Sequence, residues 1–245
     1  MKKYIPNAIT LLNLLSGSIA AIFAVNGHFV SAALFVFLGI FFDFFDGLVA
    51  RKLNVQSALG LQLDSLADVV TSGLVPGIVM YKLLALTTDA PDVTSDWNVD
   101  SFKLNIMLFP IIGLLITLAS AYRLAKFNID EDQQSYFKGL PTPANALLIV
   151  SLPLIIEFQN SDAMNAIILN KWFLIVVTLF SCYILNSNIK LFALKFETYG
   201  FKANATRYIF IILSVILLII LQFAAIPVII LFYIILSALD NASIK

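Results

Sequence analysis

The sequence predicts an all-α protein, a polytopic membrane helical bundle of about eight transmembrane helices with both termini in the cytoplasm. Of its 245 residues, 60% are hydrophobic and only 12% are charged, whereas a soluble domain has about 25% charged residues. Mean hydropathy is +0.95. The apolar residues form stretches long enough to cross a bilayer, and the basic residues between these stretches are unequally distributed.

Eight apolar stretches are expected to form the membrane helices. Their approximate bounds are 6–25, 29–50, 61–86, 104–126, 143–158, 171–190, 206–222 and 226–240. The fifth and eighth are short for a crossing of about 20 residues, so little tilt or local bilayer thinning is expected there. Only Gln222 to Pro227 separates the last two. They are predicted to form a hairpin, because one helix of about 35 residues is too long to cross once.

The basic residues predict the orientation and, with the spans, the domain organisation. With a cytoplasmic amino terminus, twelve Lys and Arg residues fall on the cytoplasmic side and three, Lys82, Lys103 and Lys171, on the other. This bias is typical of inner loops, so both termini are expected inside. Residues 1–205 are expected to form a membrane core and residues 206–245 an added transmembrane hairpin. The net charge of zero gives no indication of a nucleic-acid partner.

Four aspartates lie close together at one end of the second and third spans, in DFFDGLVARKLNVQSALGLQLDSLAD, residues 43–68. An ionised carboxylate in a membrane helix costs about 2.5–3.5 kcal/mol even on lenient insertion scales, so these residues are expected to be functional. On the second span Asp46 lies about 60° from Asp43 around the helix. On the third span Gly60, Asp64 and Asp68 follow at i, i+4 and i+8, and share one stripe.

The loop of about ten residues between these spans makes them antiparallel neighbours, so the two stripes can face each other. Four converging carboxylates, Asp43, Asp46, Asp64 and Asp68, repel one another unless cations lie between them. No Cys or His is near, and hard oxygen ligands select Mg²⁺ or Mn²⁺. The sequence therefore predicts a two-metal site of the kind suited to phosphoryl or phosphodiester displacement.

Small residues and one cation accompany the acids. Gly47, Ala50 and Gly60 would let a bulky group lie against the backbone, although small residues also serve helix packing. The guanidinium group of Arg51 could bind a diphosphate through two parallel hydrogen bonds. Alternatively, Arg51 only anchors the end of the span at the cytoplasmic membrane surface.

The pattern D-x2-D-G-x2-A-R-x8-G-x3-D-x3-D, from Asp43 to Asp68, resembles the signature of the CDP-alcohol phosphatidyltransferases, integral membrane enzymes of phospholipid synthesis. The resemblance implies a helical fold with six core helices, metal ligation by the four aspartates, and Asp68 as base toward the acceptor hydroxyl. It also implies a cytidine diphosphate lipid donor. The residues expected to bind that donor are Gly47, Arg51 and Ser57, with Ala50 and Gly60 making room and with Pro6, Asn7 and Thr10 of the similar segment PNAIT in contact. For the last three, an ordinary polar start of the first span is the alternative.

Three segments outside the signature point to the acceptor. TLLNLLSG, RLAKFN and GLPTP resemble segments of the phosphatidylserine synthase branch, although Lys126 stands where arginine is expected. Serine is a zwitterion, so its carboxylate needs cations and its ammonium needs acceptors. Arg123 and Lys126 are expected to bind the carboxylate. The alternative is that they are only basic residues at the cytoplasmic end of a span, as the positive-inside rule predicts. The residues expected to face the ammonium are Asn13, Asn128 or a carbonyl near Gly139.

The sequence therefore predicts an integral cell-membrane enzyme with its active site facing the cytoplasm. It is expected to transfer a phosphatidyl group from CDP-diacylglycerol to L-serine, giving phosphatidylserine and CMP, with Mg²⁺ or Mn²⁺. The alternatives are the same chemistry with glycerol 3-phosphate or inositol phosphate as acceptor and, more remotely, a cation transporter. A homodimer is retained as an expectation for a membrane enzyme of this size.

Overall fold

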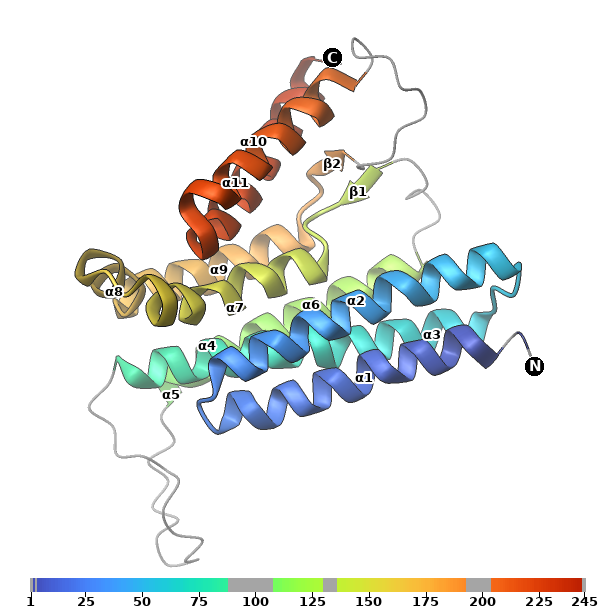
Figure 1. The fold of residues 1–245 in the computed structure, drawn as a ribbon, viewed down its shortest axis with the longest axis horizontal. Helices are drawn as coiled ribbons and strands as arrows, with labels where there is room; N and C mark the ends of the chain where they lie inside the picture. The colour runs from blue at the N-terminus through green and yellow to red at the C-terminus, as the bar shows by residue number, and fades with distance from the viewer. Residues whose placement is uncertain (1, 3, 88–107, 130–135, 193–203, 244–245) are drawn as a thin grey trace, which may run out of the picture.

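The computed structural model describes residue 2 and residues 4–87, 108–129, 136–192 and 204–243. Helices and two short strands make up this part of the chain (Figure 1). The elements are α1 (Tyr4–Val25), α2 (Phe29–Leu53), α3 (Ala58–Asp68), a π-helical turn η1 (Val69–Leu74), α4 (Val75–Leu86), α5 (Leu108–Ile111), a 3₁₀ turn η3 (Ile112–Leu114), α6 (Leu115–Ile129), β1 (Tyr136–Lys138), α7 (Thr142–Gln159), α8 (Asp162–Ile168), α9 (Lys171–Asn186), β2 (Lys190–Phe192), α10 (Ala205–Leu221), a 3₁₀ turn η5 (Gln222–Ala224) and α11 (Ala225–Ser243).

The all-α membrane bundle is confirmed. Within the described ranges, six helical segments are long and apolar enough to cross a membrane, and the bent pair α8–α9 would add a seventh. One of the six, Arg207–Leu239, is folded back on itself at the turn η5. The ring centroids of Phe210 and Phe232, on opposite sides of that turn, lie 6.2 Å apart. Its two arms, α10 and α11, correspond to the stretches expected at 206–222 and 226–240. The expected fourth span starts at 104, but residues 104–107 lie outside the described part.

The structure adds three features that were not expected. The third span is not a uniform α-helix, since η1 interrupts it directly after Asp68. A short helix, α8, meets α9 at a bend of 59°. The strands β1 and β2 pair antiparallel, with Lys138 opposite Lys190.

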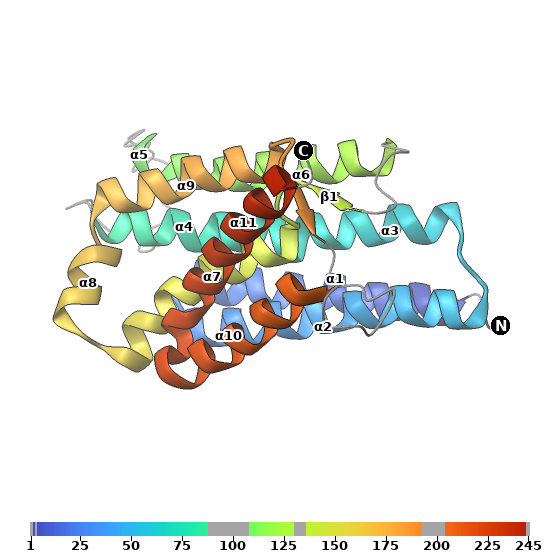
Figure 2. The ribbon, with the colours of Figure 1, turned by 90° about the horizontal axis from the view of Figure 1, so that it is seen from above.

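Helices α1 to α4, α6, α7 and α9 run roughly along a common axis, and the α10–α11 hairpin crosses them obliquely (Figures 1 and 2). At one end the start of α1, the end of α2 and helix α3 extend beyond α7 and α9. Small residues let the central helices approach closely, as is usual in membranes. A Cβ on Gly113, for example, would lie 2.6 Å from the backbone nitrogen of Tyr81. The hairpin is the least buried of the candidate spans in the described part of the chain. Of the residues in its most apolar stretch, 11% are buried, whereas the value for α7 is 61%.

The tip of the hairpin is fastened to the end of α7 by one glutamine. Gln159 Nε2 donates to the carbonyl of Leu221 at 3.1 Å, and its Oε1 accepts from the backbone nitrogen of Ala224 at 2.9 Å. Phe158 stacks on Phe223 with ring centroids 5.1 Å apart. The glutamine thus supplies hydrogen-bond partners to two backbone groups of the turn between α10 and α11.

Replacing Gln159 with alanine should lower the free energy of unfolding by about 1–2 kcal/mol, because two backbone groups lose their partners. The expected result is a lower midpoint of thermal unfolding in detergent. Glu157→Ala, an exposed position on the same helix end, is the matched control and should leave the midpoint unchanged. Equal midpoints for the two variants would show that Gln159 does not hold the hairpin.

Candidate metal centre and its flanking cavities

The reversal between α2 and α3 is built from local capping. Asn54 ends α2 in the left-handed conformation (φ 54°), which asparagine tolerates better than most residues. Ser57 then caps α3, where its hydroxyl accepts from the backbone nitrogen of Gly60 at 3.0 Å. These caps return the chain within a few residues, so that the acidic stripes of both helices lie side by side.

A cavity of about 460 Å³ lies between α1, the end of α2 and the start of α3. Its lining includes all eight residues expected to contact the donor: Pro6, Asn7, Thr10, Gly47, Ala50, Arg51, Ser57 and Gly60. A Cβ on Gly60 would lie 3.2 Å from Ser57 Oγ and 3.3 Å from Asn7 Oδ1, so its absence keeps the wall open. Gln56 and Val55 also line the cavity. They were not predicted from the sequence, although their position between Arg51 and Ser57 could have indicated that they lie at this site.

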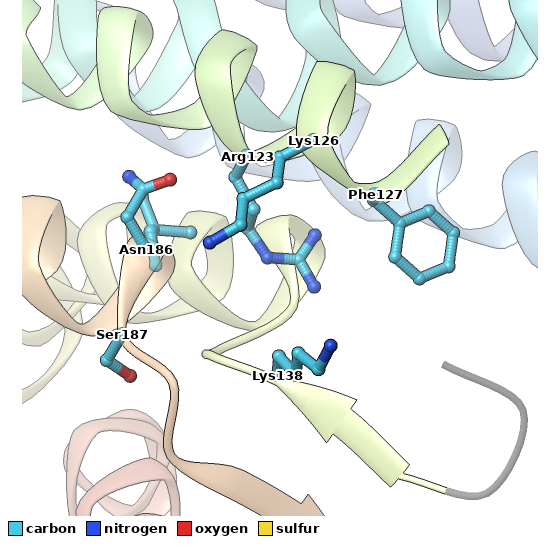
Figure 3. A pocket seen from close by; sticks show the side chains of 7 residues that line it. Arg123, Lys126, Phe127, Lys138, Asn186 and Ser187 are labelled. Atoms are coloured by element: carbon cyan, nitrogen blue, oxygen red, sulfur yellow. The ribbon is translucent and has the colours of Figure 1, made fainter. Parts of the chain in front are cut away.

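A second, smaller space is surrounded by cations (Figure 3). It is lined by Arg123, Lys126, Phe127, Lys138, Leu185, Asn186 and Ser187. Arg123 is 7% exposed, and its Nε finds no hydrogen-bond partner in the described part of the chain. The space is about 10 Å³, enough for one water molecule, so a larger guest requires the flanking lysine side chains to move.

The structure thus brings the two predicted cations together and adds residues that the sequence did not indicate. Lys138 directly precedes the GLPTP segment, so its position was open to inference. Asn186 and Ser187 lie at the end of α9, far along the chain, and no motif marked them.

The three residues expected to face the ammonium group do not line this space. Asn128 Nδ2 donates to Ser65 Oγ at 2.9 Å and joins α6 to α3. Gly139 has φ of 73° and a Cβ there would collide with the Leu185 carbonyl, so close packing accounts for this glycine. Asn13 is fully buried and donates from Nδ2 to Asp68 Oδ1 at 3.3 Å. Contact of these residues with an acceptor stays a prediction.

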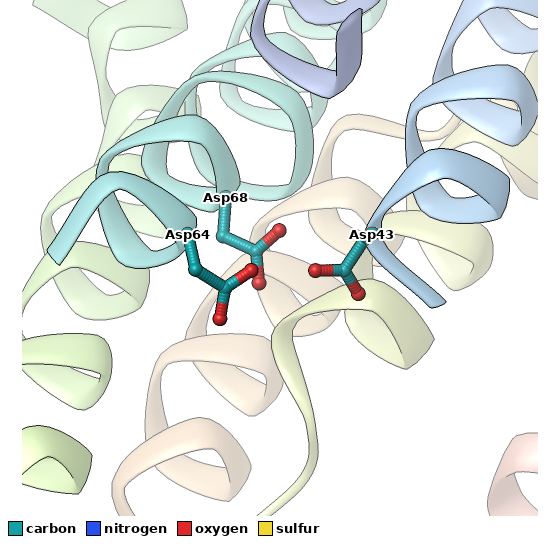
Figure 4. A group of neighbouring side chains, drawn as sticks. All are labelled: Asp43, Asp64 and Asp68. Atoms are coloured by element: carbon teal, nitrogen blue, oxygen red, sulfur yellow. The ribbon is translucent and has the colours of Figure 1, made fainter. Parts of the chain in front are cut away.

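Three of the four predicted metal ligands converge. Asp43 of α2 and Asp64 and Asp68 of α3 each offer a carboxylate oxygen, and these atoms all lie within 4.8 Å of one another. Figure 4 shows the carboxylates of α3 and α2 pointing toward each other across the gap between the helices. The i, i+4 spacing of Asp64 and Asp68 puts both on the side of α3 that faces α2.

Asp46 departs from the expected set. It lies on the next turn of α2, where Thr10 Oγ1 of α1 donates to its Oδ2 at 2.5 Å. It lines the larger cavity together with Asp64. Asp46 therefore lies outside the group of oxygens that are within 4.8 Å of one another, and its role as a metal ligand stays a prediction.

The donor set fits a hard divalent cation. Three carboxylates this close repel when ionised, and Asp64 Oδ1 is buried with no hydrogen-bond partner among the described residues. Oxygen ligands without sulfur or imidazole are those that Mg²⁺ and Mn²⁺ prefer. Arg123 is near enough to Asp68 for an electrostatic interaction, so the cationic space adjoins the acidic group.

Several known proteins are similar in sequence to about 60–67% of this chain. A CDP-diacylglycerol–serine O-phosphatidyltransferase of Bacillus subtilis is 36% identical over 153 residues, which are 61% of this chain and 75% of the relative. The protein of that name in Methanocaldococcus jannaschii is 32% identical, with 67% and 66% covered. An archaetidylserine synthase of Methanothermobacter thermautotrophicus is 31% identical, with 60% and 56% covered. The model of the CDP-alcohol phosphatidyltransferase family matches residues 3–183, well over half of the chain, and the chain belongs to that family.

Proposed function

We propose that the protein transfers a phosphatidyl group from CDP-diacylglycerol to L-serine, which gives phosphatidylserine and CMP. The observation that carries the proposal is the convergence of Asp43, Asp64 and Asp68 beside a donor-sized cavity and a cationic space. The names of the Bacillus and Methanocaldococcus relatives support serine as the acceptor.

The donor is assigned to the cavity of about 460 Å³. Its cytidine diphosphate group would lie between α1 and the α2–α3 reversal, with Arg51 as a bidentate partner for phosphate. Glycines at 47 and 60 leave room for the backbone to approach it. A divalent cation at Asp43, Asp64 and Asp68, with a second one toward Asp46, would neutralise charge on the diphosphate and on the leaving CMP.

Serine is assigned to the cationic side. Arg123 would hold the serine carboxylate, with Lys126 and Lys138 nearby. The serine hydroxyl oxygen then forms a bond to the phosphorus that carries diacylglycerol, and the bond from that phosphorus to CMP breaks. Asp68 accepts the hydroxyl proton as general base, and its electrostatic attraction to Arg123, the proposed partner of the serine carboxylate, supports this role.

Three further features belong to the proposal. The excess of basic residues on one side supports a site that faces the cytoplasm of a cell membrane. Among its described residues, the α10–α11 hairpin contributes none to either cavity, which supports residues 1–205 as the catalytic core and residues 206–245 as an addition. A homodimer stays an expectation.

One observation favours a second candidate. Lys138 gives the acceptor side a third cation beside Arg123 and Lys126, and clustered cations suit a phosphate-bearing acceptor such as glycerol 3-phosphate. A cation transporter is disfavoured, because the chain belongs to a family of phosphatidyltransferases.

The choice of acceptor is tested with purified protein in detergent, CDP-diacylglycerol and Mn²⁺. Addition of L-serine should release CMP, and addition of glycerol 3-phosphate or inositol phosphate should not. CMP release only with a phosphate-bearing alcohol would move the assignment to the second candidate. Release with no alcohol at all would contradict both.

Asp68→Asn should lower CMP release by at least about a hundredfold, because the amide cannot accept the hydroxyl proton. The variant should remain folded, as judged by its elution volume and thermal midpoint in detergent. Asp162→Asn, which changes an acid at the start of α8 away from both cavities, is the matched control and should keep full activity. Comparable losses in the two variants would exclude a specific role for Asp68.

Arg123→Gln should raise the KM for serine about tenfold to a hundredfold, because a charge-assisted hydrogen bond is worth roughly 1.5–3 kcal/mol. The KM for CDP-diacylglycerol should stay the same, since Arg123 does not line the donor cavity. Lys171→Gln, at the start of α9, is the control. An unchanged KM for serine in Arg123→Gln would place the serine carboxylate elsewhere.

A further inference from the structure

We propose that Thr71 is a positioning residue for Asp68 and acts through Asn13. The residues form a chain across two helices: Thr71 Oγ1 donates to Asn13 Oδ1 at 2.7 Å, and Asn13 Nδ2 donates to Asp68 Oδ1 at 3.3 Å. Thr71 and Asn13 are fully buried. This inference deepens the proposed function and rests on it, because Asp68 is the proposed base.

The direction of the chain follows from what each group can do. An ionised carboxylate only accepts hydrogen bonds, so the amide nitrogen of Asn13 must face Asp68. The amide oxygen then faces Thr71 and requires a donor, and the Thr71 hydroxyl supplies it. Without that hydroxyl, no group at Thr71 favours one orientation of the Asn13 amide over the other. In the reversed orientation the amide oxygen of Asn13 would face the carboxylate oxygen of Asp68 and repel it.

The surrounding helices are shaped around this contact. A Cβ on Gly17 of α1 would collide with the Thr71 side chain. A Cβ on Gly39 of α2 would meet both the Thr71 methyl group and, at 2.9 Å, Asn13 Oδ1. The two glycines therefore leave a space that the threonine side chain and the asparagine amide fill.

The π-helical turn places Thr71 in that space. It begins at Val69, immediately after Asp68, and such turns often occur at functional sites. Thr117 of α6 supports the turn, because its hydroxyl donates to the carbonyl of Gly73 at 3.1 Å. Asp68 thus lies at the junction of the α-helix and the wider turn, with its carboxylate held from α1.

The hydrogen bond from Asn13 leaves one of the two carboxylate oxygens of Asp68 available to a ligand. Asn13 occupies Oδ1 of Asp68, which fixes the rotation of the carboxylate and leaves Oδ2 free for a cation or for the acceptor proton. Partners that orient a ligand in this way typically change metal affinity or activity by tenfold to a hundredfold when they are removed.

The test is a double-mutant cycle of Thr71→Val and Asn13→Ala, with Thr71→Ser as the conservative variant. Two quantities are measured on the full-length protein in detergent: kcat for CMP release, and the dissociation constant of Mn²⁺ by electron paramagnetic resonance without substrate. Thr71→Val keeps the shape and should lower kcat and weaken Mn²⁺ binding, each about tenfold, with both KM values unchanged. Thr71→Ser keeps the donor and should restore both quantities to within about twofold of the original protein.

In the Asn13→Ala background, Thr71→Val should have little further effect, because the link is already broken. Full additivity of the two substitutions, or equal losses in Thr71→Ser and Thr71→Val, would overturn the proposal. Thr178→Val removes a buried threonine hydroxyl that bonds only within α9, and a loss as large as that of Thr71→Val would also overturn it. If the original protein releases no CMP with serine, the proposed function fails, while the Mn²⁺ titrations still decide the role of Thr71.

Discussion

The mutual repulsion of three carboxylates inside an apolar bundle is the constraint on which the rest of the structure depends. Their oxygens lie within 4.8 Å of one another between two membrane helices, where each charge is expensive to hold. The neighbouring elements supply what the acids need: hydrogen-bond donors from α1, small residues where the helices cross, and a basic side chain from α6. These neighbours surround an acidic group whose oxygen atoms are compatible with a divalent cation.

The first helix illustrates this dependence. Its sequence looks like an apolar span interrupted by a few polar residues, yet each of two polar side chains contacts a different aspartate. Thr10 donates to Asp46, and Asn13 donates to Asp68. The two aspartates also differ in position, since Asp46 lines the larger cavity and Asp68 belongs to the acidic group.

Much of this arrangement could be predicted from the sequence, because regular helices have fixed spacing. The interval between Asp64 and Asp68 puts both on one stripe, and the short loop at Asn54 makes α2 and α3 neighbours. Where the geometry was irregular or the contact distant, prediction failed. The π-helical turn after Asp68 breaks the regular period. The hydrogen bond from Thr10 of α1 to Asp46 joins residues 36 positions apart, and no spacing within α2 indicates it. Lys138, Asn186 and Ser187 come together only through the packing of β1 and the end of α9 beside α6.

The two cavities share no lining residue. Every wall of the larger one comes from residues 6–64, and every wall of the cationic one from residues 123–187. Under the proposed assignment, the half of the molecule that handles the nucleotide is encoded separately from the half that selects the alcohol. Such a division lets the second half diversify while the first stays intact. Changes of acceptor specificity are then expected mainly in α6, the β1 segment and the end of α9, which line the cationic space.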